Sequence, residues 1–191
     1  MATEAPTTPD PNDTILDAVI AILASRGVAG LAHAAVDEAV DLPPGTTQGH
    51  YHTQRELIDA AANRMVFLDA LELNGFRASA AGIAAVVERR FSVQGRKHFL
   101  ARLELTLYAA RNADFVTMHW ARDLFAAGAE AHMRIAGARM PRLAAELVIA
   151  IVEGLTLHDF ISPRMAPRDR HGLIRRALHG FLETSKGHHR L

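Results

Sequence analysis

The chain has 191 residues, no cysteine, and 21 basic and 21 acidic side chains, so its formal net charge is zero. This length allows a sizeable hydrophobic core, in one domain or in a small domain joined to a larger one. The absence of cysteine excludes a disulfide-stabilised fold, cysteine-based metal sites and thiol catalysis. Residues 1–13 lack the basic and apolar segments of a signal peptide, and no apolar run reaches the roughly 18 residues of a membrane helix. We therefore expect a cytoplasmic protein without a membrane partner.

The expected elements are helical. Residues 1–12, rich in Pro, Thr and acidic side chains, are typical of a disordered arm. Apolar residues at helical spacing predict a first helix that starts at residue 13 or 14 and that Gly27 ends. A second short helix is expected over 32–40. The break Asp-Leu-Pro-Pro-Gly and a third short helix, ending near Tyr51, follow it.

The four residues Thr-Gln-Arg-Glu at 53–56 have the pattern of a capping box, which predicts a longer fourth helix from Gln54. No segment alternates for long enough to predict a strand, so we expect an all-α fold of about nine helices. Gly, Asn-Ala-Asp and Ser-Pro signals separate the five later helices, at about 80–91, 96–111, 114–136, 142–161 and 168–184.

The second and third helices, joined by a tight turn, have the arrangement of a helix-turn-helix. In such a pair the second helix enters the major groove of DNA, and its N-terminal residues meet base edges. Gln can bind adenine through two hydrogen bonds, and Thr can donate to a base or a phosphate. The third helix offers the candidate DNA-binding residues Thr46, Thr47, Gln48, His50 and Tyr51.

Four motifs follow one another between residues 27 and 57. They are Gly27, Val36-Asp37, Leu42-Pro43-Pro44-Gly45-Thr46 and His50-Tyr51-His52-Thr53-Gln54-Arg55-Glu56-Leu57. Their order and spacing resemble, without a gap, the helix-turn-helix of the tetracycline-repressor (TetR) family. That pattern has Gly after the first helix, an Ile-Ala-like pair, a Val-Ser-x-Gly-Thr entry and a His-Phe-x-Ser-Lys-x-x-Leu exit. Residues 102–111 and 151–158 look like core segments of the same family's ligand domain.

The resemblance implies a three-helix DNA-binding head over 13–53 and a ligand-binding and dimerisation domain over 54–191. It implies a ligand-controlled transcriptional repressor that binds a palindromic DNA operator as a homodimer. The effector is an unknown small molecule, and no other cofactor is expected. Gln54, where the family usually has Lys, and Arg55 next to it are added to the candidate DNA-binding residues.

Three departures favour an alternative hypothesis. Gln48 replaces a usual aromatic residue, Gln54 replaces the usual Lys, and the usual basic N-terminal arm is absent. Residues 1–60 hold nine acidic side chains and two arginines, a balance of −7, whereas a DNA-binding surface is normally basic. The alternative is a ligand-binding or protein-interaction dimer of the same fold that has lost or weakened DNA binding.

An apolar cavity with a few polar anchors is the usual composition of a small-molecule site. Aromatic, Met and polar residues of the fourth and later helices could form one here, although the apolar members could equally be plain core. The candidate ligand-binding residues are Phe67, Phe99, Arg102, Leu103, Glu104, Tyr108, Met118, Trp120, Arg122 and His158.

The last two expected helices carry more apolar surface than a monomer covers. In the resembling family such helices form a four-helix bundle with the partner subunit, which places two recognition helices about 34 Å apart on the operator. The candidate dimer-interface residues are Leu147, Ile151, Gly154, Leu155, Leu173, Leu178, Phe181 and Leu182.

No metal site and no enzymatic activity are expected. The eleven histidines include no His-Glu-x-x-His motif and no pair spaced four residues apart. The sequence also lacks a nucleophile elbow and a phosphate-binding loop.

Overall fold

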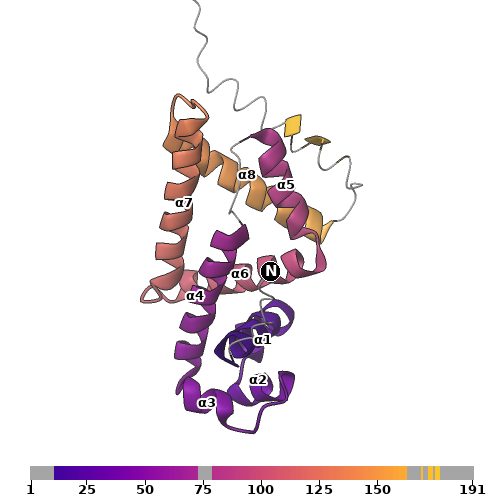
Figure 1. The fold of residues 1–191 in the computed structure, drawn as a ribbon, viewed down its shortest axis with the longest axis vertical. Helices are drawn as coiled ribbons and strands as arrows, with labels where there is room; N and C mark the ends of the chain where they lie inside the picture. Colours follow the sequence, from indigo (N-terminus) through magenta and orange to yellow (C-terminus); the bar gives the residue numbers. More distant parts are fainter. Residues whose placement is uncertain (1–10, 73–78, 163–168, 170–171, 174, 177–191) are drawn as a thin grey trace, which may run out of the picture. The chain divides into compact units, whose positions relative to one another are not determined.

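The computed structural model describes residues 11–72, 79–162, and Asp169, Gly172, Leu173, Arg175 and Arg176. In these residues the chain is helical, without strands, as predicted (Figure 1). The ninth expected helix, 168–184, lies mostly outside the described residues. The eight described α-helices and one 3₁₀ turn are α1 (Pro11–Arg26), η1 (Val28–Gly30), α2 (His33–Ala39), α3 (Thr46–His50), α4 (Gln54–Glu72), α5 (Ala80–Arg90), α6 (Val93–Arg111), α7 (Thr117–Ile135) and α8 (Pro141–Ile161).

Helix boundaries differ from the expected ones by a few residues. α1 begins at Pro11, so the last two residues of the expected arm are helical, and Pro suits a first turn. α6 begins at Val93, because the Ser92 hydroxyl accepts a hydrogen bond from the Gly95 N–H (3.0 Å). None of the described helices is long and apolar enough to span a membrane.

The chain forms two compact units. Unit 1 comprises the residues up to Leu68 together with Lys97–Met118, and unit 2 comprises Asp69–Arg96 and the residues from His119 onward. The predicted domain boundary after residue 53 therefore does not coincide with the division by packing. The boundaries 13–53 and 54–191 remain a prediction about function.

Unit 1 has a continuous apolar core. α1 supplies one side of it, and Leu57, Ile58 and Met65 of α4 supply another. Phe115, in the turn after α6, is fully buried there, and its ring meets Tyr108 edge-on at a centroid distance of 5.1 Å. The second half of α6 is therefore part of the same core as the helix-turn-helix.

Unit 2 has its own core, which α5, α7 and α8 form. Val87, Met133 and Val148 are among its buried side chains. Gly95 lies so close to the last turn of α5 that a Cβ atom there would be 2.7 Å from the Cα of Arg90 and closer still to the Arg89 carbonyl oxygen. Only glycine fits this approach without a backbone shift.

Candidate nucleic-acid interface and ligand-binding residues

A buried carboxylate joins α2 to α3. Asp37 accepts hydrogen bonds from the Gly45 N–H (2.8 Å), the Thr47 N–H (2.8 Å) and the Thr47 hydroxyl (2.5 Å). The hydroxyl bond of Thr47, which outweighs the opposing effect of burial, holds the pKa of Asp37 below its ordinary value. Gly45 has a φ of 89°, a left-handed conformation that glycine adopts readily. The start of α3 is therefore fixed to α2.

This anchoring decides which residues of α3 remain accessible. Thr47 is fully buried, and the Thr46 hydroxyl donates to the Pro43 carbonyl (2.6 Å). Gln48 and His50 are exposed. Of the five residues predicted on this helix, these two have the side chains most accessible to a partner.

The ends of the helix-turn-helix are tied to neighbouring elements. The Tyr51 hydroxyl donates to the Asn12 side chain of α1 (2.5 Å). The Gln54 amide donates to the Leu31 carbonyl (2.6 Å), so Gln54 holds α4 against the entry to α2. These contacts give Tyr51 and Gln54 structural roles, and their contact with DNA remains a prediction.

The capping box is confirmed with one variation. The Thr53 hydroxyl accepts from the Glu56 N–H (3.1 Å), as expected for the start of α4. The Glu56 carboxylate accepts from the N–H of His52 (2.8 Å) instead of that of Thr53. The box therefore also fixes the residue that precedes the cap.

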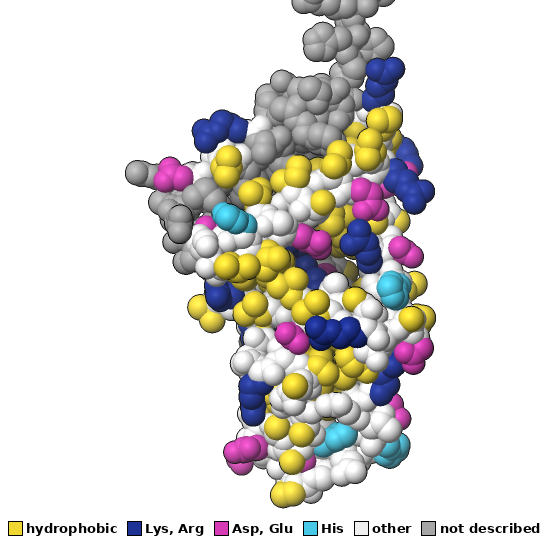
Figure 2. All heavy atoms as spheres, turned by 180° about the vertical axis from the view of Figure 1, so that it is seen from behind, with side chains coloured by type: hydrophobic (Ala, Val, Ile, Leu, Met, Phe, Trp, Pro, Cys, Tyr) yellow, Lys and Arg dark blue, Asp and Glu magenta, His cyan; other side chains and the backbone are white. Residues whose placement is uncertain are grey.

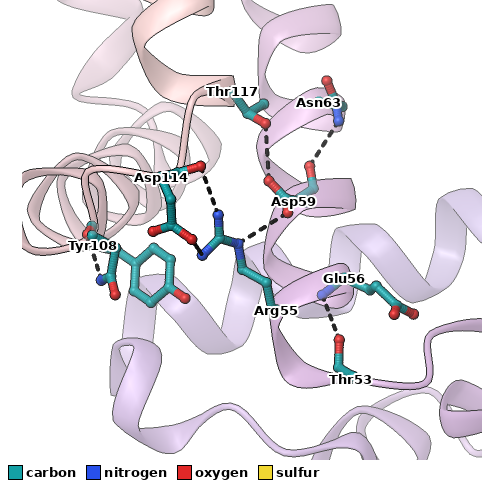
Figure 3. Close-up of polar contacts among 9 residues, drawn as sticks. Thr53, Arg55, Glu56, Asp59, Asn63, Tyr108, Asp114 and Thr117 are labelled. Atoms are coloured by element: carbon teal, nitrogen blue, oxygen red, sulfur yellow. Dashed lines mark hydrogen bonds and ion pairs between the residues drawn. The ribbon is translucent and has the colours of Figure 1, made fainter.

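Arg55 forms a network inside unit 1 (Figure 3). Its guanidinium pairs with Asp59 (3.2 Å) and Asp114 (3.2 Å) and donates to the Asp114 carbonyl (3.1 Å). It also lies over the rings of Phe115 (5.0 Å) and Tyr108 (6.0 Å). Burial works against its charge, but the carboxylates keep the pKa of Arg55 above its ordinary value. Arg55 thus links α4 to the turn after α6, and its predicted phosphate contact is untested.

Glu104, a candidate ligand-binding residue, lies against the turn after α1. Its carboxylate accepts from the Val28 N–H (3.4 Å). Gly27 has φ 67° and ψ −175°, and a Cβ atom there would lie 2.9 Å from Glu104 Oε2. Gly27 ends α1, as predicted, and also makes room for this carboxylate.

The other candidate ligand residues are divided between the units. In unit 1, Phe99 is buried, Tyr108 and Met118 pack against the core, Arg102 and Leu103 are half-buried, and Phe67 is 54% exposed. In unit 2, Trp120 is 57% exposed, His158 is exposed, and Arg122 pairs with Glu146 (3.3 Å).

One hollow in unit 2 has a volume of about 420 Å³ and contains none of the candidate ligand residues. Its two carboxylates, Glu130 and Glu146, pair with Arg134 and Arg122. The residues that line it are Glu130, Met140, Pro141, Arg142, Leu143 and Glu146. In the part of the chain that the structure describes, no cluster of three or more His, Asp or Glu side chains could hold a metal ion.

α8 carries an exposed apolar stripe, with residues spaced alternately four and three apart. Sequence reasoning found two of its members, Leu147 and Gly154. Ile151 and Leu155, also predicted at the interface, pack against the unit 2 core. Leu173 is 38% exposed, and Leu178, Phe181 and Leu182 lie outside the described residues. The stripe consists of Leu143, Leu147, Ala150, Gly154, Leu157 and Ile161.

The architecture is that of a helix-turn-helix protein whose second unit is also built of helices in the residues that the structure describes. Residues 75–184, more than half of the chain, match the family model of the tetracyclin repressor-like C-terminal domain. The chain therefore belongs to the TetR family of transcriptional regulators. Members of this family are DNA-binding regulators without enzymatic activity. No curated protein is similar enough to be matched.

Similar solved structures have the same fold. A transcriptional regulator from Rhodococcus sp. Rha1 has a TM-score of 0.80 at 17% identity, over 93% of this chain and 99% of that chain. A TetR-family member from Streptomyces coelicolor A3 has a TM-score of 0.70 at 23% identity, over 88% and 98%. A regulator from Saccharomonospora viridis, solved in complex with choline, has a TM-score of 0.73 at 16% identity, over 90% and 95%. The predicted all-α TetR fold is confirmed.

Proposed function

We propose that this regulator is a ligand-responsive repressor that binds a palindromic operator as a homodimer. The observation that carries the proposal is the geometry of α3. Asp37 fixes the start of this helix, while Gln48 and His50 project from it into solvent. A short helix held rigidly by a buried carboxylate, with polar side chains exposed, suits insertion into the major groove.

Gln48 is the best candidate for reading bases. Its side-chain NH2 group can donate to N7 of adenine while its side-chain carbonyl oxygen accepts from the N6 amino group, the two-bond arrangement typical of Gln and Asn. Thr47 cannot take this role in the described conformation, because its hydroxyl is buried against Asp37. We therefore expect base discrimination to depend more on Gln48 than on Thr47.

The α8 stripe supports a second copy of the chain as partner. Alternating spacings of four and three residues keep apolar side chains on one seam, as in helices that pair. Leu143 is 49%, Leu157 39% and Ile161 72% exposed, so the described residues leave this seam largely open to solvent. At Gly154, in the middle of the seam, an added Cβ would meet no atom within 4 Å in the single chain.

Gly154 provides a direct test of the dimer. Gly154→Arg leaves the monomer fold intact because the position is open, but it places a charge in the seam. We expect sedimentation to show a dimer for the wild type and a monomer for this variant. Gly128→Arg, at an equally open helical glycine of α7, is the matched control and stays dimeric. A wild-type monomer, or a dimeric Gly154→Arg variant, contradicts the proposed seam.

Ligand control follows from differential affinity for two conformations of the dimer. The Saccharomonospora viridis relative was solved with choline, which supports a small organic molecule as effector for this chain. Helices α4, α6 and α7 contribute residues to both units. A conformational change that a ligand causes in unit 2 can therefore reach the helix-turn-helix through them. The contact of Glu104 with the Val28 N–H holds α6 to the turn after α1, and the contacts of Arg55 hold α4 to the turn after α6.

DNA binding is tested with the intergenic DNA upstream of the protein's own gene and random DNA of equal length, at low and moderate salt. We expect the upstream fragment to bind more tightly at both salt concentrations and Gln48→Ala to reduce that preference, by about 1–3 kcal/mol per lost base contact. A Gly49→Ala variant, open around its Cβ, controls for general damage to α3. Equal and weak affinity for both fragments would overturn the repressor proposal.

The second candidate function is a dimer of this fold that no longer binds DNA. The observation in its favour is the charge of −7 over residues 1–60. It predicts that ligands still raise the melting temperature while neither DNA fragment binds.

A further inference from the structure

The helix-turn-helix has no permanent positive charge. Between Arg26 and Arg55 the sequence contains no Lys or Arg, but it contains three histidines, His33, His50 and His52. A DNA-binding surface needs cations, because neutralising phosphates supplies most of the non-specific affinity for a duplex. The positive charge must therefore come from outside this segment or from its histidines.

The neighbouring arginines are largely engaged elsewhere. Arg55 is held by Asp59 and Asp114. Arg64 pairs with Asp13 (2.9 Å) and Asp17 (3.2 Å) of α1, with only 15% of its side chain exposed. Arg26, at the end of α1, is exposed. One accessible arginine is little compensation for the nine acidic side chains of residues 1–60.

The histidines occupy the helix-turn-helix itself. His33 is the first residue of α2, His50 is the last residue of α3, and His52 precedes α4 by two residues. His50 and His52 are exposed, whereas His33 is half-buried and its Nε2 atom is buried, so His50 and His52 are the histidines accessible to a partner. Figure 2 shows histidine side chains, in cyan, beside carboxylates at the end of unit 1 that α2 and α3 form.

We propose that protonated His50 and His52 are the phosphate-binding groups of this helix-turn-helix, so that DNA binding is coupled to proton uptake. The inference rests on the proposed operator binding. It assigns to imidazolium groups the role for which Lys and Arg are normally used.

The charged groups around the histidines are mostly acidic. Phosphate adds negative charge to a site that is already acidic. The charged groups on the elements packed around the histidines are Asp13, Asp17 and Arg26 of α1, Asp37 and Glu38 of α2, Asp41 of the turn, and Arg55 and Glu56 of α4. Two of the carboxylates near the histidines have hydrogen-bonding roles in the fold: Asp37 anchors α3, and Glu56 accepts from the His52 N–H.

The proposal predicts how the DNA affinity depends on pH and on salt concentration. Histidine ordinarily gains its charge between about pH 8 and pH 5. For each proton taken up on binding, the association constant rises by up to about tenfold for each unit by which the pH is lowered. Each imidazolium–phosphate contact also steepens the slope of log affinity against log salt by about 0.9.

The experiment measures filter binding of full-length protein to the end-labelled upstream fragment and to random duplex, at pH 8, 7 and 6. We expect wild-type affinity to rise at least tenfold from pH 8 to pH 6, with a steeper salt dependence at pH 6. His50→Gln combined with His52→Gln should remove most of that rise, since both side chains are exposed and their loss spares the core. The matched control is His119→Gln, at an exposed histidine of α7 in unit 2, and it keeps the wild-type response.

A second double variant separates loss of positive charge from misfolding. His50→Arg combined with His52→Arg should bind DNA at pH 8 as tightly as the wild type binds it at pH 6. Tight wild-type binding that does not change with pH, or an unchanged pH response in the double Gln variant, overturns this inference and leaves the repressor proposal intact. Absence of binding by the wild type and by the double Arg variant at every pH overturns the repressor proposal itself.

Discussion

Replacing Gly27 by Ala tests whether the turn after α1 has the strained geometry that the structure shows. At φ 67° and ψ −175° the backbone is in a region almost exclusive to glycine, where another residue costs about 1–3 kcal/mol. The added Cβ would also lie 2.9 Å from Glu104 Oε2, but that atom ends a flexible side chain and can move. We therefore expect a loss of about 2 kcal/mol, or about 4–8 °C in melting temperature for a chain of this length.

Urea denaturation of four proteins separates the two effects: wild type, Gly27→Ala, Glu104→Ala and the double variant. If backbone strain dominates, Gly27→Ala costs the same with and without the Glu104 carboxylate. Gly49→Ala, where an added Cβ meets nothing within 4 Å, is the control and should cause no loss. A Gly27→Ala variant as stable as the wild type would refute the assigned turn geometry.

Three further substitutions test the packing and the anchoring of α3. Phe115→Ala removes a fully buried ring from the unit 1 core and should cost about 3–5 kcal/mol in denaturant unfolding; a loss below about 1 kcal/mol would show that the turn after α6 does not belong to this core. Gly95→Ala forces a Cβ against the backbone of Arg89 and should destabilise the protein by about 3 kcal/mol in the same assay, so an unchanged midpoint would contradict the close approach of α6 to α5. Asp37→Asn should lower stability at neutral pH. Because folding depresses the pKa of Asp37, its stabilising effect is present above the unfolded-state value of about 3.9 and is lost as the pH falls through the folded-state value. The difference between wild type and variant should therefore be largest above about pH 5 and shrink below about pH 4, and a difference independent of pH would count against the buried carboxylate.

The local features of the fold were predictable from the sequence. Gly27 ends α1, and the Thr53–Glu56 box starts α4, because stop and cap signals act over only a few residues. The helix-turn-helix was recognisable because its motifs lie within about thirty residues of one another. Boundaries shifted where a single cap decided them, as at Ser92 before α6.

Tertiary partners were not predictable in the same way. Arg55 meets Asp114, a residue 59 positions away, and no local pattern indicates that pairing. Asp37 was counted as one of the acidic side chains and as part of the Val36-Asp37 pair, but its role as the carboxylate that anchors the start of α3 was not predicted. Both cases required knowledge of which helices pack together.

The proposed dimer interface on α8 shows a further limit of prediction from the sequence. This helix is apolar on much of its circumference, so the sequence did not reveal which side the core takes. The structure assigns Ile151 and Leu155 to the unit 2 core and leaves Leu147, Gly154 and Leu157 exposed. The four-three spacing of the exposed set was present in the sequence, but without the core it could not be separated from its neighbours.

Hydroxyl-radical footprinting of the upstream DNA tests the central claim most directly. Two copies of α3 in one dimer predict two protected patches on the duplex, about 34 Å apart and related by two-fold symmetry, which weaken with Gln48→Ala and disappear with Gly154→Arg. Uniform protection along the fragment, or no protection at any salt concentration at which the dimer is intact, would contradict the account.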